Sequence, residues 1–167
     1  TIIETKAIGF TVGDKVTIIP YMHCGNCTAC NSGKNNCCVN MRVFGVHIDG
    51  GMREFVTVPN HALLKSEGLS LDELALVEPL AIGAHAVKRA AVDSGEFVLV
   101  IGAGPIGLGI AQFARIAGAH VVVVDVIDDR LQFCTTHVGV EHTINPLKQD
   151  IMEALKQITS NNMPTVV

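Results

Sequence analysis

The sequence predicts an α/β protein built from two dissimilar parts. The second part alternates unbroken apolar runs, at residues 97–101 and 121–124, with a helical pattern, which is typical of parallel strands covered by helices on both faces. The first part places five of the six cysteines within residues 24–38, between two short strand patterns. We therefore expect a β-rich segment with a metal-binding lobe, followed by a parallel sheet.

Composition limits the kinds of partner. Of the 167 residues, 49% are hydrophobic and 17% are charged, which suffices for the packed core of one or two small domains. The net charge of -4 and the lack of a Lys/Arg run argue against nucleic acid or an anionic membrane surface. No apolar stretch approaches the about 18 residues that span a bilayer, and the first residues do not resemble a signal peptide. We expect a cytoplasmic protein without nucleic acid or membrane partners.

Two strands are expected in the first part, on either side of the cysteines. At residues 12–20 a Gly-Asp turn precedes alternating apolar residues, and residues 53–59 form a second strand that Pro59 stops. The lobe at residues 24–38 has no apolar core of its own, so a bound metal is expected to replace hydrophobic burial there.

Helices are expected after this β-rich segment. Ser70 and Glu73 form a capping box that begins a short helix. Pro79 interrupts that helix and begins a new one, which runs toward Arg89. Glu78 is therefore expected at a helix junction.

The segment between the two apolar runs is expected to be a helix that Gly118 ends, which completes a βαβ unit. A helix at residues 128–138, a strand near 142–144 and a helix at about 150–159 continue this pattern. Residues 165–167 have the pattern of a strand that has only begun, so the parallel sheet is expected to be incomplete. The apolar face of the first helix comprises Ile106, Ile110, Phe113, Ala114 and Ala117.

The cysteine spacing indicates a metal site. Two Cys-x2-Cys steps bring Cys24, Cys27 and Cys30 toward one point, and Cys38 can complete a tetrahedron around Zn2+. Four thiolates leave no open coordination position, so this site is predicted to be structural. Spacing alone does not decide between Cys37 and Cys38 as the fourth ligand.

Other interpretations of the cysteines are weaker. An iron-sulfur cluster fits less well, because the last spacing is longer than in the ferredoxin run and no proline follows. Reduced thiols without a metal are rare in this spacing. Cys134 lies in a helical pattern and is predicted to be a small buried apolar residue.

A glycine motif predicts a dinucleotide site. Gly102, Gly104 and Gly107 follow a predicted buried strand and begin a helix, and Asp125 ends the next strand. Gly102 permits the tight turn, Gly104 admits the pyrophosphate, and Gly107 lets helix and strand approach. The helix N-terminus offers N–H groups to the phosphates. The Asp125 carboxylate can accept hydrogen bonds from the ribose hydroxyls of NAD. It would repel the 2'-phosphate of NADP, so NAD is favoured.

The chain carries five ordered motifs: Gly13-Asp-Lys-Val, the run from Pro20 to Cys38, Gly45-Val-His-Ile-Asp-Gly-Gly51, Glu78-Pro-Leu-Ala-Ile-Gly-Ala-His85 and Gly102-Ala-Gly-Pro-Ile-Gly107. In this order they resemble the zinc-containing medium-chain dehydrogenase family, near its sorbitol, threonine and galactonate-type sugar-acid dehydrogenases. The resemblance implies part of a GroES-like catalytic domain over residues 1–78 and the N-terminal part of a Rossmann-type NAD-binding domain over 79–167. It also implies hydride transfer from a secondary alcohol to NAD.

The resemblance assigns roles to single residues. It makes Cys24, Cys27, Cys30 and Cys38 the ligands of the structural zinc, and so favours Cys38 over Cys37. It places Ile106, Asp125 and Arg130, with the glycines, at the NAD site. It places Glu78 near a catalytic zinc, directly or through water, whereas the alternative from the residues is a carboxylate that caps the following turn.

Two histidines, His47 and His85, are implied to border the cleft, although a structural histidine is the favoured interpretation of each.

The resemblance also has a limit. The other expected ligands of a catalytic zinc would lie before Thr1, and further sheet strands after Val167, so the chain resembles the middle of a protein about twice its length. We expect that these residues alone do not turn over substrate and that the complete protein is a homo-oligomer. A non-catalytic module that binds zinc and a dinucleotide is the alternative.

Overall fold

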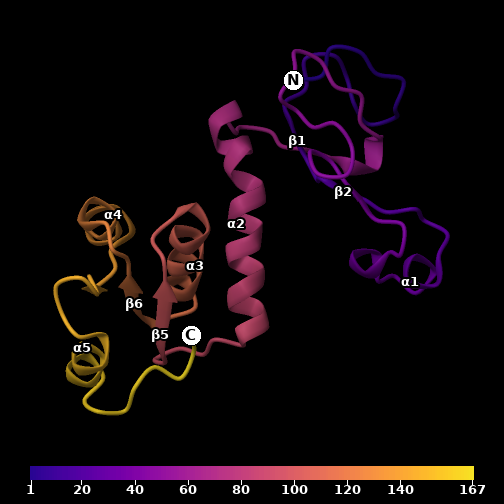
Figure 1. Cartoon of the computed structure of the whole chain (residues 1–167). Coiled ribbons are helices and arrows are strands. Elements are labelled where there is room, and N and C mark those ends of the chain that lie inside the picture. Colours follow the sequence, from indigo (N-terminus) through magenta and orange to yellow (C-terminus); the bar gives the residue numbers. More distant parts are fainter. The chain divides into compact units, whose positions relative to one another are not determined.

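A parallel sheet forms the second half of the chain, in a computed structural model that describes residues 1–167. Strands β5 (Phe97–Ile101), β6 (His120–Val124) and β7 (His142–Ile144) are neighbours in this order (Figure 1). On the other side of β5, Val98 forms a parallel bridge with Val166, and the Leu99 N–H donates to the Val166 carbonyl over 2.9 Å. The parallel sheet expected from the sequence is confirmed, and residues 165–167, where a strand was expected, form an isolated bridge beside β5.

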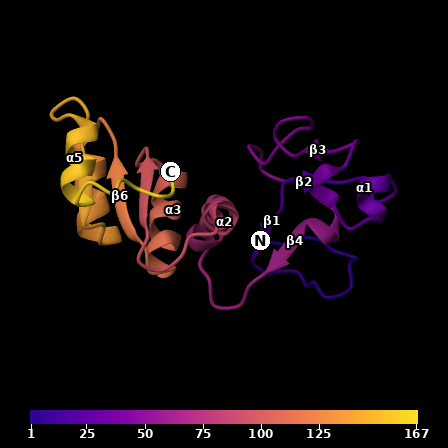
Figure 2. The same ribbon diagram turned by 90° about the horizontal axis from the view of Figure 1, so that it is seen from below.

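Helices cover both faces of this sheet. On one face lie α3 (Pro105–Ile116) and α4 (Asp128–Phe133), which a π-helical turn (Cys134–Val138) extends, and α5 (Ile151–Ile158) lies on the other. Figure 2 shows β6 between α3 and α5. The expected helices and strands of this half are thus confirmed.

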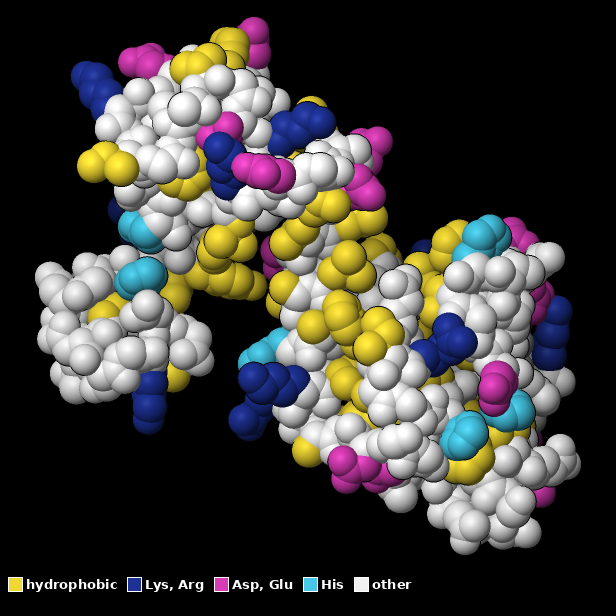
Figure 3. Space-filling model, turned by 180° about the vertical axis from the view of Figure 1, so that it is seen from behind, with side chains coloured by type: hydrophobic (Ala, Val, Ile, Leu, Met, Phe, Trp, Pro, Cys, Tyr) yellow, Lys and Arg dark blue, Asp and Glu magenta, His cyan; other side chains and the backbone are white.

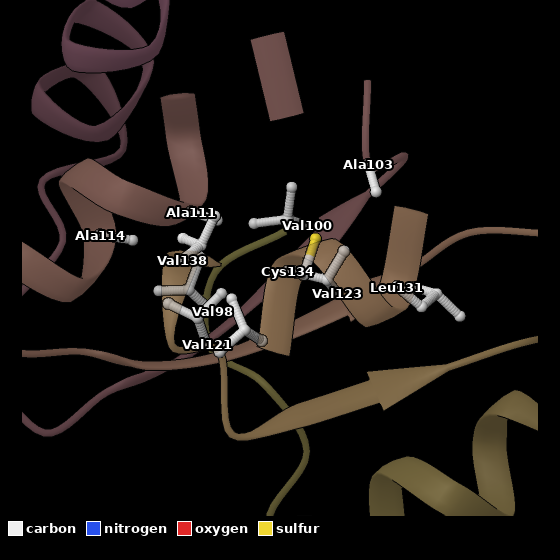
Figure 4. Close-up of a cluster of buried hydrophobic side chains, with 11 residues drawn as sticks. Val98, Val100, Ala103, Ala111, Ala114, Val121, Val123, Leu131, Cys134 and Val138 are labelled. Atoms are coloured by element: carbon white, nitrogen blue, oxygen red, sulfur yellow. The ribbon is translucent and has the colours of Figure 1, made fainter. Parts of the chain in front are cut away.

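Each strand of this sheet contributes side chains to two cores. Alternate residues face opposite sides of a strand, so Val98 and Val100 pack toward α3 while Leu99 packs toward α5. Cys134 is fully buried in the first core, as predicted (Figure 4). Burial raises the pKa of its thiol, so Cys134 remains a neutral apolar side chain.

One long helix, α2 (Leu71–Ala90), replaces the two helices expected around Pro79. The capping box is present, since the Ser70 Oγ accepts from the Glu73 N–H and the Glu73 carboxylate accepts from the Ser70 N–H. The prediction of a break was wrong: Pro79 removes one helical hydrogen bond, but the turn that follows it packs closely on α3, where Gly83 approaches Gly109, and stays helical. Glu78 therefore lies within a continuous helix and not at a junction.

The first half is irregular, with short antiparallel ladders. Strand β1 (Val16–Ile18) pairs with β4 (Leu63–Lys65), and β2 (Tyr21–Met22) pairs with β3 (Arg42–Val43). The strand expected within residues 12–20 is confirmed. The strand expected at 53–59 is wrong, because these residues have no pairing partner and β1 is paired instead by β4.

Short helices join these strands in the first half: α1 (Thr28–Asn31), η1 (Asn35–Cys37) and η2 (Asn60–Ala62).

The chain divides into two compact units, Thr1–Val77 and Glu78–Val167. The boundary lies inside α2, so the last turns of the first unit and the first turns of the second belong to one helix.

Large apolar side chains remain exposed on α2. Leu76 is 54% exposed and Ile82 is 37% exposed, and Figure 3 shows hydrophobic side chains gathered along this helix. A helix that keeps apolar residues on its exposed side has surface available for further packing.

Candidate zinc and dinucleotide sites

Four thiols converge in the first unit. The sulfur atoms of Cys24, Cys27, Cys30 and Cys38 all lie within 4.8 Å of one another, and those of Cys27 and Cys30 are 3.5 Å apart. A tetrahedral zinc with Zn–S bonds of about 2.3 Å separates its sulfurs by about 3.8 Å. The four side chains therefore fit a closed Zn2+ site without a large rearrangement.

Two short helices, α1 and η1, position the cysteine sulfur atoms. Cys27 immediately precedes α1 and Cys30 lies within it, so one helical turn aims both sulfurs the same way. Cys38 follows η1 and is buried, and its sulfur accepts from the Cys24 N–H at 3.3 Å. Cys37, which the spacing left as a competitor, is exposed and lies outside the group.

Backbone N–H groups stabilise negative charge on part of this cluster. The Asn26 N–H is the main cause that lowers the pKa of Cys24 to about 6, and the N–H groups of Cys30 and Val39 lower that of Cys27. Burial, followed by the Cys27 thiol, raises the pKa of Cys30 to about 11. The lobe therefore stabilises some of the four thiols as thiolates by itself. Four thiolates together need a cation, such as a metal ion, to balance their negative charge.

The glycine motif forms a tight loop between β5 and α3. Gly102 has a φ of +100°, which an L side chain rarely adopts, and Gly104 caps α3 ahead of Pro105. A Cβ atom at Gly107 would lie 1.9 Å from the Gly102 carbonyl oxygen, whereas a Cβ at Gly104 would meet nothing within 4 Å. Gly107 is thus required by the protein's own packing, and Gly104 leaves open space beside the helix N-terminus.

The loop lies where the strand order of the sheet reverses. From β5 the chain moves through β6 to β7 and then returns past β5 to Val166. In open parallel sheets, ligands bind outside the carboxyl ends of the strands at this switch point. An apolar cavity of about 640 Å³ borders the loop, with Gly104, Ile106 and Val166 in its wall.

Asp125 joins the loop to the end of β6. Its carboxylate accepts from the Ala103 N–H at 2.7 Å and from the Ile127 N–H at 2.8 Å, and the Arg130 guanidinium lies 3.7 Å away. Burial acts to raise the pKa of this carboxyl, but these donors outweigh it and hold the pKa below its ordinary value. Asp125 is thus ionised at neutral pH, and its carboxylate is held by backbone donors on both oxygens.

Two further residues predicted at this site lie on the surface near the loop. Ile106 is 49% exposed in the first turn of α3, and the Arg130 side chain is half exposed beside Asp125.

Asn145 is a buried polar residue that sequence reasoning missed. It follows β7, and its side-chain amide donates to the Val126 carbonyl and to the Asp128 carboxylate. It therefore ties β7 to the loop that carries Asp125. Its position directly after a strand, at the same edge of the sheet, was the available signal.

The other residues singled out from the sequence are neither members of the thiol cluster nor among the residues that line the cavity beside the glycine loop. His47 accepts the Val43 N–H at its Nδ1 over 2.9 Å, which is the local structural role favoured for it. His85 is exposed on α2, and Glu78 is half-buried in the same helix.

No helix of the chain combines the length and the apolar character needed to cross a bilayer.

Comparison with known proteins identifies the family of this chain. Residues 1–68 match the model of the alcohol dehydrogenase GroES-like domain, and residues 105–167 match the model of the zinc-binding dehydrogenase. The chain thus belongs to the zinc-containing medium-chain dehydrogenase family.

Individual relatives are consistent with this assignment. The chain is 44% identical, over 95% of its length and 46% of the relative's, to an uncharacterised zinc-type alcohol dehydrogenase-like protein of Haemophilus influenzae. It is 45% identical to L-galactonate-5-dehydrogenase of Escherichia coli K12, over 86% of the chain and 42% of the relative. The chain therefore spans less than half the length of these curated relatives.

A solved structure shares the fold. It is an alcohol dehydrogenase from Escherichia coli CFT073 complexed with NADH, with a TM-score of 0.80 and 34% identity. The match covers 89% of this chain and 44% of that one. These comparisons, with the cysteine cluster, support the prediction of zinc and a nicotinamide cofactor.

Proposed function

We propose that the complete protein is a zinc-dependent oxidoreductase that transfers hydride from a secondary alcohol of a polyol, sugar acid or related substrate to NAD. Within it, residues 1–78 would be part of the GroES-like catalytic domain, and residues 79–167 the first part of the NAD-binding domain. The observation that carries the proposal is the glycine loop at the switch point of the sheet, with an ionised Asp125 at its edge.

Each group of residues has a task in this proposal. Cys24, Cys27, Cys30 and Cys38 would hold a structural zinc that maintains the fold of the lobe. Gly102, Gly104 and Gly107, together with the N-terminus of α3, would receive the pyrophosphate.

The adenosine end of NAD would lie against Asp125, Arg130 and Ile106. The ionised carboxylate of Asp125 suits the ribose hydroxyls as an acceptor, and its negative charge opposes a 2'-phosphate. The charge of Asp125 therefore favours NAD over NADP.

A catalytic zinc, when bound in the complete protein, would polarise the alcohol oxygen while the nicotinamide accepts the hydride. We propose that Glu78 lies near this metal. A half-buried carboxylate in α2 can orient a metal-bound group or accept a proton from it.

A substrate screen tests the activity. Polyols and sugar acids are offered to the complete protein with NAD or NADP, and reduced cofactor is followed by absorbance. We expect turnover with NAD and a strong preference for it over NADP. Binding of zinc and NAD without turnover of any alcohol would favour the non-catalytic module instead.

Glu78→Gln tests the placement of Glu78. We expect a loss of turnover of at least about tenfold with NAD affinity retained, because the amide keeps the shape and removes the charge. An unchanged kcat would remove Glu78 from the site.

Cysteine replacements test the structural zinc. We expect Cys38→Ser to lower bound zinc by one equivalent per chain in elemental analysis, while Cys37→Ser, the matched control, keeps it. Equal zinc content in the two variants would contradict the ligand set.

A further inference from the structure

A buried amide holds the loop that carries Asp125. Asn145 directly follows β7 and is only 6% exposed. Its side-chain nitrogen donates to the Val126 carbonyl over 3.2 Å and to the Asp128 carboxylate over 2.8 Å. Its side-chain oxygen accepts from the Leu147 N–H over 3.0 Å. An amide nitrogen has two N–H donors, so Asn145 uses both of them on the chain that follows β6.

This loop has little other support. The side chains of Val126 and Ile127 are 53% and 42% exposed, so the cores hold them only in part. Ile127 precedes α4 as its N-cap and makes no capping hydrogen bond through its side chain. The Ile127 N–H donates to the Asp125 carboxylate over 2.8 Å. The loop is therefore fixed mainly by two polar side chains, Asp125 from within it and Asn145 from the end of β7.

Asp128 requires a hydrogen-bond donor at position 145. One of its carboxylate oxygens accepts from Asn145, and the other pairs with the Lys148 ammonium over 2.5 Å. Lys148 first, and then Asn145, hold the pKa of this carboxyl below its ordinary value, so Asp128 is negative at neutral pH. The Val126 carbonyl, which receives the other donor, is also only an acceptor. Position 145 therefore suits an amide, whereas a carboxylate there would face two acceptors without a donor.

We propose that Asn145 is a positioning residue for the adenosine ribose of NAD. It acts through the backbone. By holding the Val126 carbonyl it keeps the Ile127 N–H on the Asp125 carboxylate, and so fixes the orientation of that carboxylate. A carboxylate held in one orientation separates ribose hydroxyls from a 2'-phosphate better than one that is free to turn. The proposal rests on the proposed placement of NAD at Asp125 and names a residue that sets its selectivity.

Calorimetric titration of the complete protein with NAD and with NADP tests this role without turnover. Asn145→Ala removes both donors and adds no charge. We expect this variant to bind NAD about tenfold more weakly and NADP at most about threefold more weakly. The two cofactors differ because a loosened Asp125 loses its hydrogen bonds to the ribose and also its repulsion of the 2'-phosphate. A general loss of structure would instead weaken the binding of both cofactors equally.

An exchange of donor and acceptor provides a second test. Asn145→Asp keeps the shape of the side chain but removes its donors, so we expect NAD to bind at least about tenfold more weakly. Adding Asp128→Asn to this variant returns a donor to the pair, and NAD affinity should recover by at least about threefold. Asn162→Ala, at an exposed amide after α5, is the matched control and should keep both affinities. Urea unfolding of each variant establishes that it is folded during the titrations.

Three results would overturn the inference and leave the proposed function standing. They are an unchanged NAD affinity in Asn145→Ala, an equal weakening of NAD and NADP binding in that variant, and a paired variant that binds NAD no better than Asn145→Asp. A wild-type protein that binds neither cofactor would contradict the proposed NAD site and the inference with it. Selective NAD binding without oxidation of any alcohol would count against the proposed activity alone.

Discussion

Single glycines in the loop after β5 serve different physical purposes. A Cβ at Gly107 would overlap the Gly102 carbonyl, while a Cβ at Gly104 would enter open space. The motif G-x-G-x-x-G already assigns close helix–strand packing to Gly107 and room for a ligand to Gly104, and the structure supplies the distances. The structure separates the glycine that folding needs from the glycine that a ligand would need.

Alanine at the two positions should therefore give different results. We expect Gly107→Ala to lower the free energy of unfolding by more than about 2 kcal/mol, because backbone atoms would have to move. Gly104→Ala should cost at most about 1 kcal/mol and still weaken NAD binding, because the methyl group would occupy the space for the pyrophosphate. Urea unfolding and calorimetric titration with NAD measure both quantities, and equal effects on stability would contradict this assignment.

Asp125 predicts a specific dependence on pH. Its pKa is lower in the folded protein than in the unfolded chain, so its stabilisation is present above the unfolded value of about 4 and is lost as the pH falls through the folded value. We expect Asp125→Asn to cost about 1–3 kcal/mol at pH 7, because an amide cannot replace both carboxylate oxygens as acceptors.

As the pH falls from about 5 to about 3, the free energy of unfolding should decrease less for Asp125→Asn than for the wild type. Exposed Asp129→Asn is the control. Chemical unfolding across this range measures the difference, and parallel curves for wild type and Asp125→Asn would contradict the role of the carboxylate.

At the scale of elements, α2 and α3 cross at a pair of glycines. A Cβ at Gly83 would lie 2.7 Å from the Gly109 carbonyl carbon, whereas a Cβ at Gly109 would make only ordinary contacts, the nearest at 3.6 Å. Helix propensity alone favours alanine over glycine by about 1 kcal/mol at either position. The close approach of the two helices therefore makes an alanine substitution destabilising at Gly83 only.

We expect Gly109→Ala to stabilise the protein by up to about 1 kcal/mol and Gly83→Ala to destabilise it by about 1–3 kcal/mol. Thermal or urea unfolding of the two variants provides the comparison. Stabilisation by both substitutions would show that the helices can separate without cost.

Elements also show where local patterns mislead. The capping box correctly placed the beginning of α2, because a cap depends on residues three positions apart. The effect of Pro79 was predicted wrongly, because tertiary packing can outweigh the loss of one helical hydrogen bond. The strand at Leu63–Lys65 was missed, because three residues carry little periodicity and their pairing with β1 depends on a segment far away in sequence.

At the scale of the whole molecule, the two units rely on different sources of stability. The second unit has two apolar cores around its sheet, whereas the residues of the zinc lobe have only Cys38 buried. A lobe without a core depends on its metal, and a unit with a core does not.

Removal of zinc should therefore act locally. After treatment with a strong chelator, we expect amide hydrogen exchange to rise at least tenfold within residues 24–38 and to stay unchanged within β5 and β6. Mass spectrometry of exchanged peptides measures this, and readdition of Zn2+ should restore protection. Uniform loss of protection across both units would mean that the lobe supports the whole chain.

The sequence by itself determined the α/β class, the parallel order of β5 and β6, the cysteine spacing and the glycine motif. These features depend on periodicity and short spacings, which act over a few residues. Only the tertiary structure decided that Asp125 accepts from the Ala103 N–H and that Asn145 ties β7 to the loop that carries Asp125. Those relations depend on where the backbone carries side chains in space, which packing settles and local pattern does not.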